Sequence, residues 1–330
     1  MVAPSAFASS KSYVEFTPEL VRGTAQAVDS TTEAVPVVAP KWEPKINWLP
    51  DKGMRGSPVD VYDEVAGGRH DEWTAKSAIY PDTFPFLAVA ALGSADVVSG
   101  SGPYLHTIGL KRSGDTQPRS YTIDAFDGQA TRQLAGGQLS KIDFNWTAEG
   151  AMDIDMLWLG NAATYEAEST PTYSTQRMVP GWDVGMTITN NNTSATVISD
   201  LTGGSLSIDR KAAAIMIAGQ QSSFQNWAES ISVTGKFMCV VQNSDEVLAD
   251  SLASVSTTVT LTFTDPDTGY YGSFVMSKVQ LMNPIIDQSK SYLEIDCNFE
   301  AVGNTVDAVD TGYSPIKFIG SNGVSTAYNT

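Results

Sequence analysis

The sequence has few of the residues on which metal sites and most catalytic centres depend. It contains two histidines and two cysteines in 330 residues. His70 and His106 lie far along the chain from Cys239 and Cys297, so these residues do not form the closely spaced ligand set of a zinc site. Both cysteines fall in apolar, strand-like segments, where we expect small core thiols, with a disulfide as the alternative. We therefore expect no metal and no cofactor.

The motifs of nucleophilic catalysis and phosphate binding are also missing. There is no Gly-x-Ser-x-Gly elbow, and the glycine-rich stretches do not open helices as a phosphate loop does. Two acidic pairs, Asp153 with Asp155 and Glu294 with Asp296, have the residue types that glycoside hydrolysis uses. They alternate with apolar residues, as on the solvated face of an amphipathic strand. We expect no catalytic residue, and keep a glycoside hydrolase that uses these pairs as an alternative.

Long apolar runs do not occur either. The longest, Phe86–Leu92, is too short to cross a bilayer. The first residues lack the basic region and apolar core of a secretory signal. We therefore expect no membrane partner.

Positive charge is scarce. The chain has 20 Lys and Arg against 37 Asp and Glu, a formal net charge of −17. Binding to nucleic acid depends on neutralising phosphates, so a chain this acidic should repel DNA. Beside DNA, an acidic surface would let the duplex slide without sticking; elsewhere it favours solubility.

The sequence does contain a long series of strand-like segments. Apolar residues make up 42% and charged residues 17% of the chain, a mixture that suits sheets and turns. Alternation predicts strands at 105–111, 120–126, 139–146, 151–159, 184–189, 196–200, 205–209, 231–241, 258–264, 272–282 and 292–302. Helices are predicted at 84–92, ended by Gly93, and at 244–252, with Ser244 as N-cap. The predicted fold class is mainly β, with β-sandwich or half-barrel domains and short flanking helices.

The chain divides by composition into five parts. Residues 1–50 contain six prolines and no sustained period, which predicts an extended N-terminal arm and not a core element. A first β unit with a long loop follows at 51–160, then a polar linker at 161–180, a second β unit at 181–303 and a C-terminal extension at 304–330. Both β units combine one short helix with long strands. We interpret Leu139–Asp143 and Leu206–Asp209 as corresponding parts of an internal duplication.

A series of short motifs follows in the second half. They are Gly181-Trp-Asp-Val-Gly-Met-Thr-Ile188, Leu206-Ser-Ile-Asp-Arg210, Ile231-Ser-Val-Thr-Gly-Lys-Phe237, Asp245-Glu-Val-Leu248, Met282-Asn-Pro-Ile285 and Leu293-Glu-Ile-Asp-Cys-Asn-Phe-Glu-Ala301. With the hairpin at 139–160 and the preceding arm and loop, this succession resembles the major tail tube protein family of long-tailed, siphovirus-type bacteriophages. The resemblance covers about residues 40–303 and rests on the order of the elements.

The resemblance implies a structural, non-enzymatic subunit of the virion tail that assembles in the host cytoplasm. Proteins of this family resemble β-sandwiches whose inner sheets join around a ring into one continuous barrel, the lumen of the tail. Rings stack through arms, long loops and C-terminal extensions. DNA and the tape measure protein pass through the lumen without specific binding, and other tail proteins meet the tube ends. Family rings are commonly sixfold, so this homo-oligomer would be a hexamer or, if the duplication is real, a pseudo-hexameric trimer.

Particular residues can be assigned to these roles. The acids that alternate along the longest strands are candidates for the lumen: Asp143, Asp153, Asp155, Glu294, Asp296 and Glu300. Aromatic and basic residues of the arm and loop are candidates for contacts between rings: Trp42, Trp48, Arg55 and Arg69. The alternative function is a carbohydrate-binding or adhesion module of a virion or cell surface, with tryptophans as stacking platforms. Those tryptophans are Trp42, Trp48, Trp73, Trp146, Trp158, Trp182 and Trp227.

Overall fold

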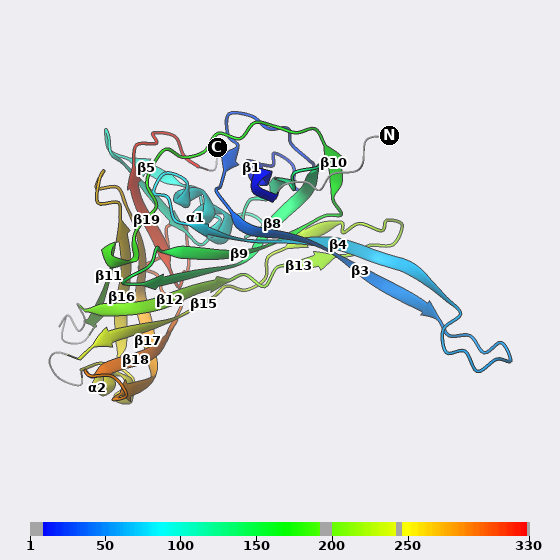
Figure 1. The fold of residues 1–330 in the computed structure, drawn as a ribbon. Helices are drawn as coiled ribbons and strands as arrows, with labels where there is room; N and C mark the ends of the chain where they lie inside the picture. Colours follow the sequence, from blue (N-terminus) through cyan, green and yellow to red (C-terminus); the bar gives the residue numbers. More distant parts are fainter. Residues whose placement is uncertain (1–8, 192–199, 242–245, 329–330) are drawn as a thin grey trace.

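The computed structural model describes residues 9–191, 200–241 and 246–328. Antiparallel strands make up most of these residues, so the mainly β fold expected from the sequence is confirmed. Figure 1 shows sheets packed around a helix, α1, and a long hairpin, β3–β4, that projects away from them. Most of the strand expected at 196–200, and the expected N-cap Ser244, lie outside the described residues.

The largest element is a continuous antiparallel sheet, called the main sheet below. Its strand order is β3–β4–β9–β8–β12–β15–β18–β17. The strands are β3 Val38–Asp51, β4 Asp63–Ala78, β8 Thr131–Thr147, β9 Asp153–Gly160, β12 Leu201–Asp209, β15 Ser232–Val240, β17 Tyr271–Asp287 and β18 Glu294–Ala301. The β8–β9 pair confirms the hairpin expected at 139–160.

Two long strands, β8 and β17, leave the main sheet and enter smaller sheets. The first part of β17 pairs with β16 and β19, and this second sheet continues to β11, β6 and β5. The first part of β8 pairs with β7 and β10, and β7 is followed by β1 and β2. These strands are β1 Tyr13–Pro18, β2 Glu33–Ala34, β5 Val97–Ser99, β6 Tyr104–Gly109, β7 Tyr121–Phe126, β10 Thr164–Glu166, β11 Val184–Asn190, β16 Ser256–Thr264 and β19 Lys317–Asn322.

Helix α1 (Phe84–Leu92) confirms the helix expected at these residues. Pro85 stands in the first turn, where a helix loses nothing by the missing N–H. Gly93 ends the helix with a φ of 82°, a left-handed conformation that glycine adopts without steric cost. All of its residues are buried, so α1 is a core element and not an amphipathic surface helix.

The remaining elements are short. The second helix, α2 (Glu246–Leu252), contacts β17, where the hydroxyl of Ser251 donates to the carbonyl of Leu281 at 3.1 Å. Two 3-10 turns are η1 (Ser9–Lys11) and η2 (Gly181–Asp183). A two-stranded hairpin, β13 (Ala213–Ile215) with β14 (Gln225–Trp227), lies between β12 and β15 in the chain.

An aromatic cluster around α1 joins the main sheet to the second sheet. Phe84 contacts the rings of Phe144, Phe263, Phe274 and Phe318 at centroid distances between 5.1 and 5.7 Å. Phe144 belongs to β8, and the other three belong to β16, β17 and β19. Aromatic pairs of this kind contribute about 0.5–1.5 kcal/mol each beyond the area they bury. The two sheets therefore share one core.

The strand order repeats within the chain. In the first repeat β3–β4, α1, β7–β8 and β9 come in this order, with β5 and β6 inserted after α1. In the second, β12–β15, α2, β16–β17 and β18 do so, with β13 and β14 inserted after β12. The order in the sheet is β3–β4–β9–β8 and then β12–β15–β18–β17. The same bulge occurs in both: residues 121 and 123 face 137 and 134, and residues 257 and 259 face 279 and 276. Strand β8 therefore corresponds to β17.

This correspondence corrects the alignment expected from the sequence. Leu139–Asp143 and Leu206–Asp209 lie in β8 and β12, which are paired neighbours and not equivalent strands. Their sequences look alike because both strands alternate between the same core and the same polar face.

The N-terminal and loop regions also differ from expectation. Strand β1 is buried along its whole length, so this part of residues 1–50 is a core element and not an arm. Much of the long loop expected in the first β unit is strand β4, and only residues 52–62 connect it to β3. Prolines interrupt the sequence pattern of β3, and Pro40 lies in the bulge between Val38 and Lys41, where a strand tolerates proline. In the C-terminal extension, β19 pairs with both β6 and β17. The division of the chain into five parts stays a prediction.

Candidate functional site: the open face of the main sheet and its hairpins

The main sheet packs one face on the core, and its other face, called the open face below, is polar. Strand pairing decides which residues share a face, because directly opposite side chains point the same way. One row across the sheet is Lys76, Asp155, Asp143, Ser207, Thr234, Glu300 and Gln280. The next row is Asp153, Asn145, Ser205, Lys236, Asn298 and Met282. The open face thus crosses both repeats without a break.

All six residues expected at the lumen lie on this face of the sheet. Five of them are exposed or half-buried: Asp143, Asp153, Asp155, Asp296 and Glu300. Glu294 shares their side of β18 but is buried. The structure therefore brings together the acids that alternation selected, although they come from three strands of two repeats. That they line a lumen stays a prediction.

Lysines accompany most of these acids. The ion pairs are Asp143 with Lys141 at 2.7 Å, Asp155 with Lys76 at 3.0 Å, Asp296 with Lys236 at 2.6 Å and Glu294 with Lys290 at 2.5 Å. Hydrogen bonds from Lys290 and Thr202 lower the pKa of Glu294 below its ordinary value. Among the described residues, Asp153 and Glu300 have no ion-pair partner. The open face is therefore densely polar, with an acidic excess smaller than the acids alone suggest.

Two hairpins extend beyond the main sheet. The first is β3–β4 with its tip at 52–62, and the second is residues 211–230, which contain β13 and β14. They run side by side: the amide of Arg69 donates to the carbonyl of Gln221 at 2.7 Å, and the amide of Ser223 donates to the carbonyl of Arg69 at 3.0 Å. Figure 1 shows β13 lying along the base of the projecting β3–β4 hairpin.

Apolar side chains are exposed on both hairpins. On the first they are Trp48, Leu49, Met54, Val59 and Val65, and on the second Ile215, Met216, Ile217, Phe224 and Trp227. Sequence reasoning missed the second set, although the run Ile215–Ile217, ended two residues later by Gly219, is a signal that could have found it. Clustered exposed apolar groups typically mark a protein–protein contact.

The expected ring-contact residues fall in two places on the first hairpin. Trp48 is 55% exposed in the projecting part. Arg55 lies at the tip, where it pairs with Asp51 and stands 4.8 Å from the ring of Tyr62. The other two, Trp42 and Arg69, lie at the base of the hairpin and are engaged inside the subunit.

Asp71 holds the base of this hairpin together. It is fully buried and accepts hydrogen bonds from the Trp42 indole at 2.9 Å, from the Arg69 guanidinium at 2.8 and 2.7 Å, and from the Ala163 amide at 2.9 Å. Arg132 adds a cation–π contact, 4.7 Å from the Trp42 ring. Sequence reasoning did not single out Asp71, because its donors come from three separate segments.

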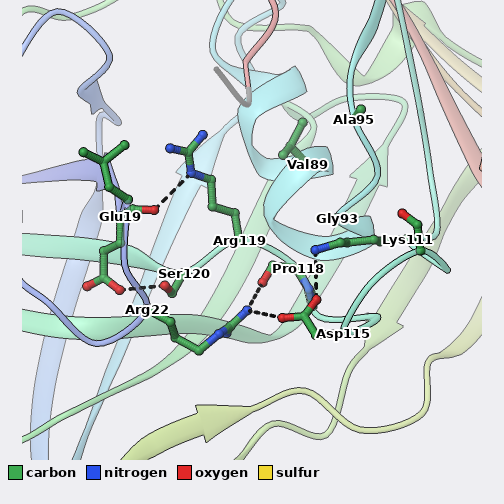
Figure 2. Close-up of a pocket in the computed structure, with 12 residues that line it drawn as sticks. Glu19, Arg22, Val89, Gly93, Ala95, Lys111, Asp115, Pro118, Arg119 and Ser120 are labelled. Carbon is green, nitrogen blue, oxygen red and sulfur yellow. Dashed lines mark hydrogen bonds and ion pairs between the residues drawn. The ribbon is translucent and has the colours of Figure 1, made fainter.

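A charged pocket lies where residues 19–22 approach the loop before β7 (Figure 2). Asp115 pairs with Lys111 at 2.9 Å and lies 3.8 Å from Arg22, which also donates to the carbonyl of Pro118 at 2.7 Å. Burial lowers the pKa of Arg22 from its ordinary value, and the charge of Asp115 opposes that shift. The charged groups bind one another, so they fasten the segment after β1 to this loop.

Other features bear on the alternatives. Trp73, Trp146 and Trp158 are core residues, so they are not the stacking platforms that a carbohydrate-binding module would need. Cys239 and Cys297 are free and buried, as expected. Within the described ranges, no group of three or more His, Cys, Asp or Glu is placed to hold a metal. No helix among the described residues is both long enough and apolar enough to cross a membrane.

The comparison with protein families gives a match that fits this architecture. The matching family is described as phage tail tube protein, and the match spans residues 44–301. That range begins in β3 and ends with β18, so it takes in most of both repeats and both hairpins. A comparison with curated proteins finds no match. Because the family match covers well over half of the sequence, this chain belongs to the phage tail tube protein family, a family of structural components of the virion tail.

Proposed function

We propose that the chain is the subunit of a siphovirus-type tail tube and that the open face of its main sheet lines the lumen. The observation that supports this best is the continuity of the open face, whose polar rows cross both repeats. The opposite face of the same sheet is sealed by the core. A sheet with one apolar and one polar side suits the wall of a water-filled passage. In this role the protein is structural and carries no catalytic site.

The chemistry of the open face suits the passage of DNA. Asp153 and Glu300 add unpaired negative charge, while lysines pair with the other four acids expected at the lumen. At physiological salt, charges act over about 8 Å, so the wall influences phosphates only close to contact. DNA and the tape measure protein would then move through the lumen without specific binding.

The two hairpins provide a means of stacking rings. Their exposed apolar side chains lie at the end of the molecule that extends beyond the sheet. In a stack, that end would meet the next ring and bury these groups. Trp48 and Arg55 are the residues of the expected set that this contact would use, whereas Trp42 and Arg69 support the hairpin from within the subunit.

The repeat favours a ring of three copies. Each subunit supplies two equivalent sets of four sheet strands, so three subunits supply the six units of the sixfold rings that the resemblance implies. We therefore propose a pseudo-hexameric trimer in place of a hexamer. Other tail proteins would close the tube ends, and assembly would take place in the host cytoplasm.

Negative-stain electron microscopy of the purified protein tests this function. Rings or tubes with a hollow centre are the expected result. A protein that stays monomeric at high concentration and at several salt levels would contradict the proposal.

A hairpin variant tests the stacking role separately. Replacement of residues 52–62 by a two-residue Asn-Gly turn should shorten tubes to rings, because the turn still closes the hairpin while the tip is lost. The matched control is Trp182→Ser, which removes an exposed aromatic side chain outside both hairpins and outside the C-terminal extension and should leave the tubes intact. Tubes of unchanged length in the hairpin variant would count against this role.

A further inference from the structure

The junction between the two repeats shows how one unit of this sheet joins the next. β8 ends the first repeat in the sheet, and β12 begins the second. Across the junction Asn145 faces Ser205 on the open face, and Phe144 faces Leu206 in the core. The junction therefore extends both faces of the sheet from one unit into the next.

The two outer strands of the main sheet correspond to these junction strands. The shared bulge makes residues 285–287 of β17 the counterparts of residues 143–145 of β8. The pairing with the following strand agrees, since Asp143 faces Asp155 where Ile285 faces Asp296. The end of β17 is thus equivalent to the β8 side of the junction, but no neighbouring strand in the described part of the chain corresponds to β12.

Strand β3 is the counterpart of β12. Lys41 faces Thr74 of β4, as Ser205 faces Lys236 of β15. Trp42 and Glu43 follow Lys41 as Leu206 and Ser207 follow Ser205. β3 therefore supplies the other side of the same junction.

Both outer strands have a free edge. β16 pairs with β17 only up to Gln280, whereas β12 pairs with β8 beyond the corresponding point. Within the described residues, no strand pairs with this edge of residues 283–287, nor with the edge of β3 that faces away from β4. Ile285 and Ile286 are 60% and 38% exposed at this edge. An unpaired edge that exposes isoleucines is a template for a strand of another molecule.

We propose that β3 of a second copy of this chain pairs antiparallel with residues 283–287, in the register of the internal junction. The proposal rests on the proposed tube function, because it names the contact that closes the ring. It places Asp287 opposite Lys41 of the partner subunit. It also places Ile286 opposite Trp42 of the partner subunit, and Ile285 opposite Glu43 of the partner subunit.

Two of the three opposed pairs in this register are chemically complementary. Asp287 and Lys41 have opposite charges and both stand on the open face. Ile286 and Trp42 are apolar and take the core-side positions that Phe144 and Leu206 hold in the internal junction. The contact is head-to-tail, and its repetition generates a closed ring when the rotation from one copy to the next closes.

Disulfide trapping tests the register. Opposite residues of antiparallel strands bring their Cβ atoms to about 4.5–5.5 Å, whereas a diagonal pair is about 7–8 Å apart. The variant with Lys41→Cys and Asp287→Cys should therefore cross-link between subunits of assembled tubes upon mild oxidation. The control with Glu43→Cys and Asp287→Cys keeps the same face with a shift of two residues and should not. Native Cys239 and Cys297 are buried and stay in both variants.

The cross-linked products separate this proposal from the proposed function. Cross-links of the first pair alone, in a ladder that ends at three subunits, support the register and the ring of three. Tubes that cross-link through the control pair, or through neither pair, overturn the register and leave the tube function standing. A wild-type protein that forms no rings or tubes overturns both.

An exchange of charge covers the case in which the cysteine pair does not assemble. Asp287→Lys should raise the protein concentration needed for assembly about two- to five-fold, the range for one exposed ion pair. Addition of Lys41→Asp to the same chain should reverse this effect. A double variant that assembles no better than Asp287→Lys overturns the register.

Discussion

Glu15 of β1 lies directly opposite Asp124 of β7, and both carboxyl groups are buried. Burial, together with the charges of Glu15 and Glu166, raises the pKa of Asp124 to about 6, against the opposing effect of a hydrogen bond from Gln133 at 3.0 Å. When two acids face each other in a buried strand pair, burial and repulsion between their charges disfavour ionisation of one of them. The pairing of β1 with β7 therefore buries one carboxyl group, Asp124, whose ionisation is sensitive to pH.

Asp124→Asn should make stability less dependent on pH. The folded protein keeps a proton on Asp124 up to a pH of about 6, whereas the unfolded chain releases it near its ordinary pKa of 3.8. Between these values the free energy of unfolding falls as the pH rises, and the loss is complete above pH 6. From pH 4 to pH 8, the free energy of unfolding of the variant should rise relative to that of the wild type by at most about 3 kcal/mol. Urea denaturation at both pH values measures this; an equal difference at both would contradict it.

Asp71→Ala should destabilise the base of the β3–β4 hairpin. The change leaves the Trp42 indole, the Arg69 guanidinium and the Ala163 amide without their shared acceptor. A loss of about 2–4 kcal/mol is expected, because each donor stays largely desolvated. Asp60→Ala, at the exposed tip of the same hairpin, should change stability by less than about 0.5 kcal/mol. Urea midpoints of the two variants provide the measurement, and equal midpoints would refute this role of Asp71.

The parts of the fold that could be predicted from the sequence are those encoded by neighbouring residues. The helix at 84–92 has its proline and its terminal glycine within one short segment. The open face follows from a period of two along single strands, so Asp153 and Asp155, or Asp296 and Glu300, could be assigned to one side before their strands were placed. These signals need no knowledge of what packs against them.

The parts that could not be predicted depend on partners far along the chain. β3 contains Pro40 and Pro44, and β4 contains Gly67 and Gly68, which resemble the breaks of a loop. Their strands form because each pairs with the other, and β4 also pairs with β9. Pairing between distant segments likewise decides which of two similar strands are neighbours and which are equivalent. The site at Asp71 was missed for the same reason.

Gly93→Ala should destabilise the protein more than an alanine substitution at another glycine with a positive φ. Gly93 has a φ of 82°, and a Cβ there would stand 2.6 Å from the Cα of Pro118. Gly114 has a φ of 61°, but a Cβ there would meet nothing within 4 Å. Gly114→Ala should cost about 1 kcal/mol for backbone conformation alone. Gly93→Ala should cost about 1–3 kcal/mol more, because the end of α1 must move in a packed core. Thermal unfolding of the two variants compares them directly, and similar melting temperatures would show that α1 tolerates the shift.

Reversal of charge on the open face should cause assembled tubes to bind DNA. Asp153→Lys with Glu300→Lys replaces two acids of this face that lack a lysine partner. Assembled tubes of this variant should retain short duplex DNA at low salt, and the retention should fall steeply as salt is added, since each phosphate contact adds about 0.9 to the log–log slope. Asp60→Lys with Glu64→Lys makes the same change of charge on the projecting hairpin, away from the open face. Fluorescence anisotropy of labelled DNA with purified tubes provides the comparison. If the hairpin variant retains DNA as strongly as the open-face variant, the lumen assignment fails, because net charge alone would then explain the binding.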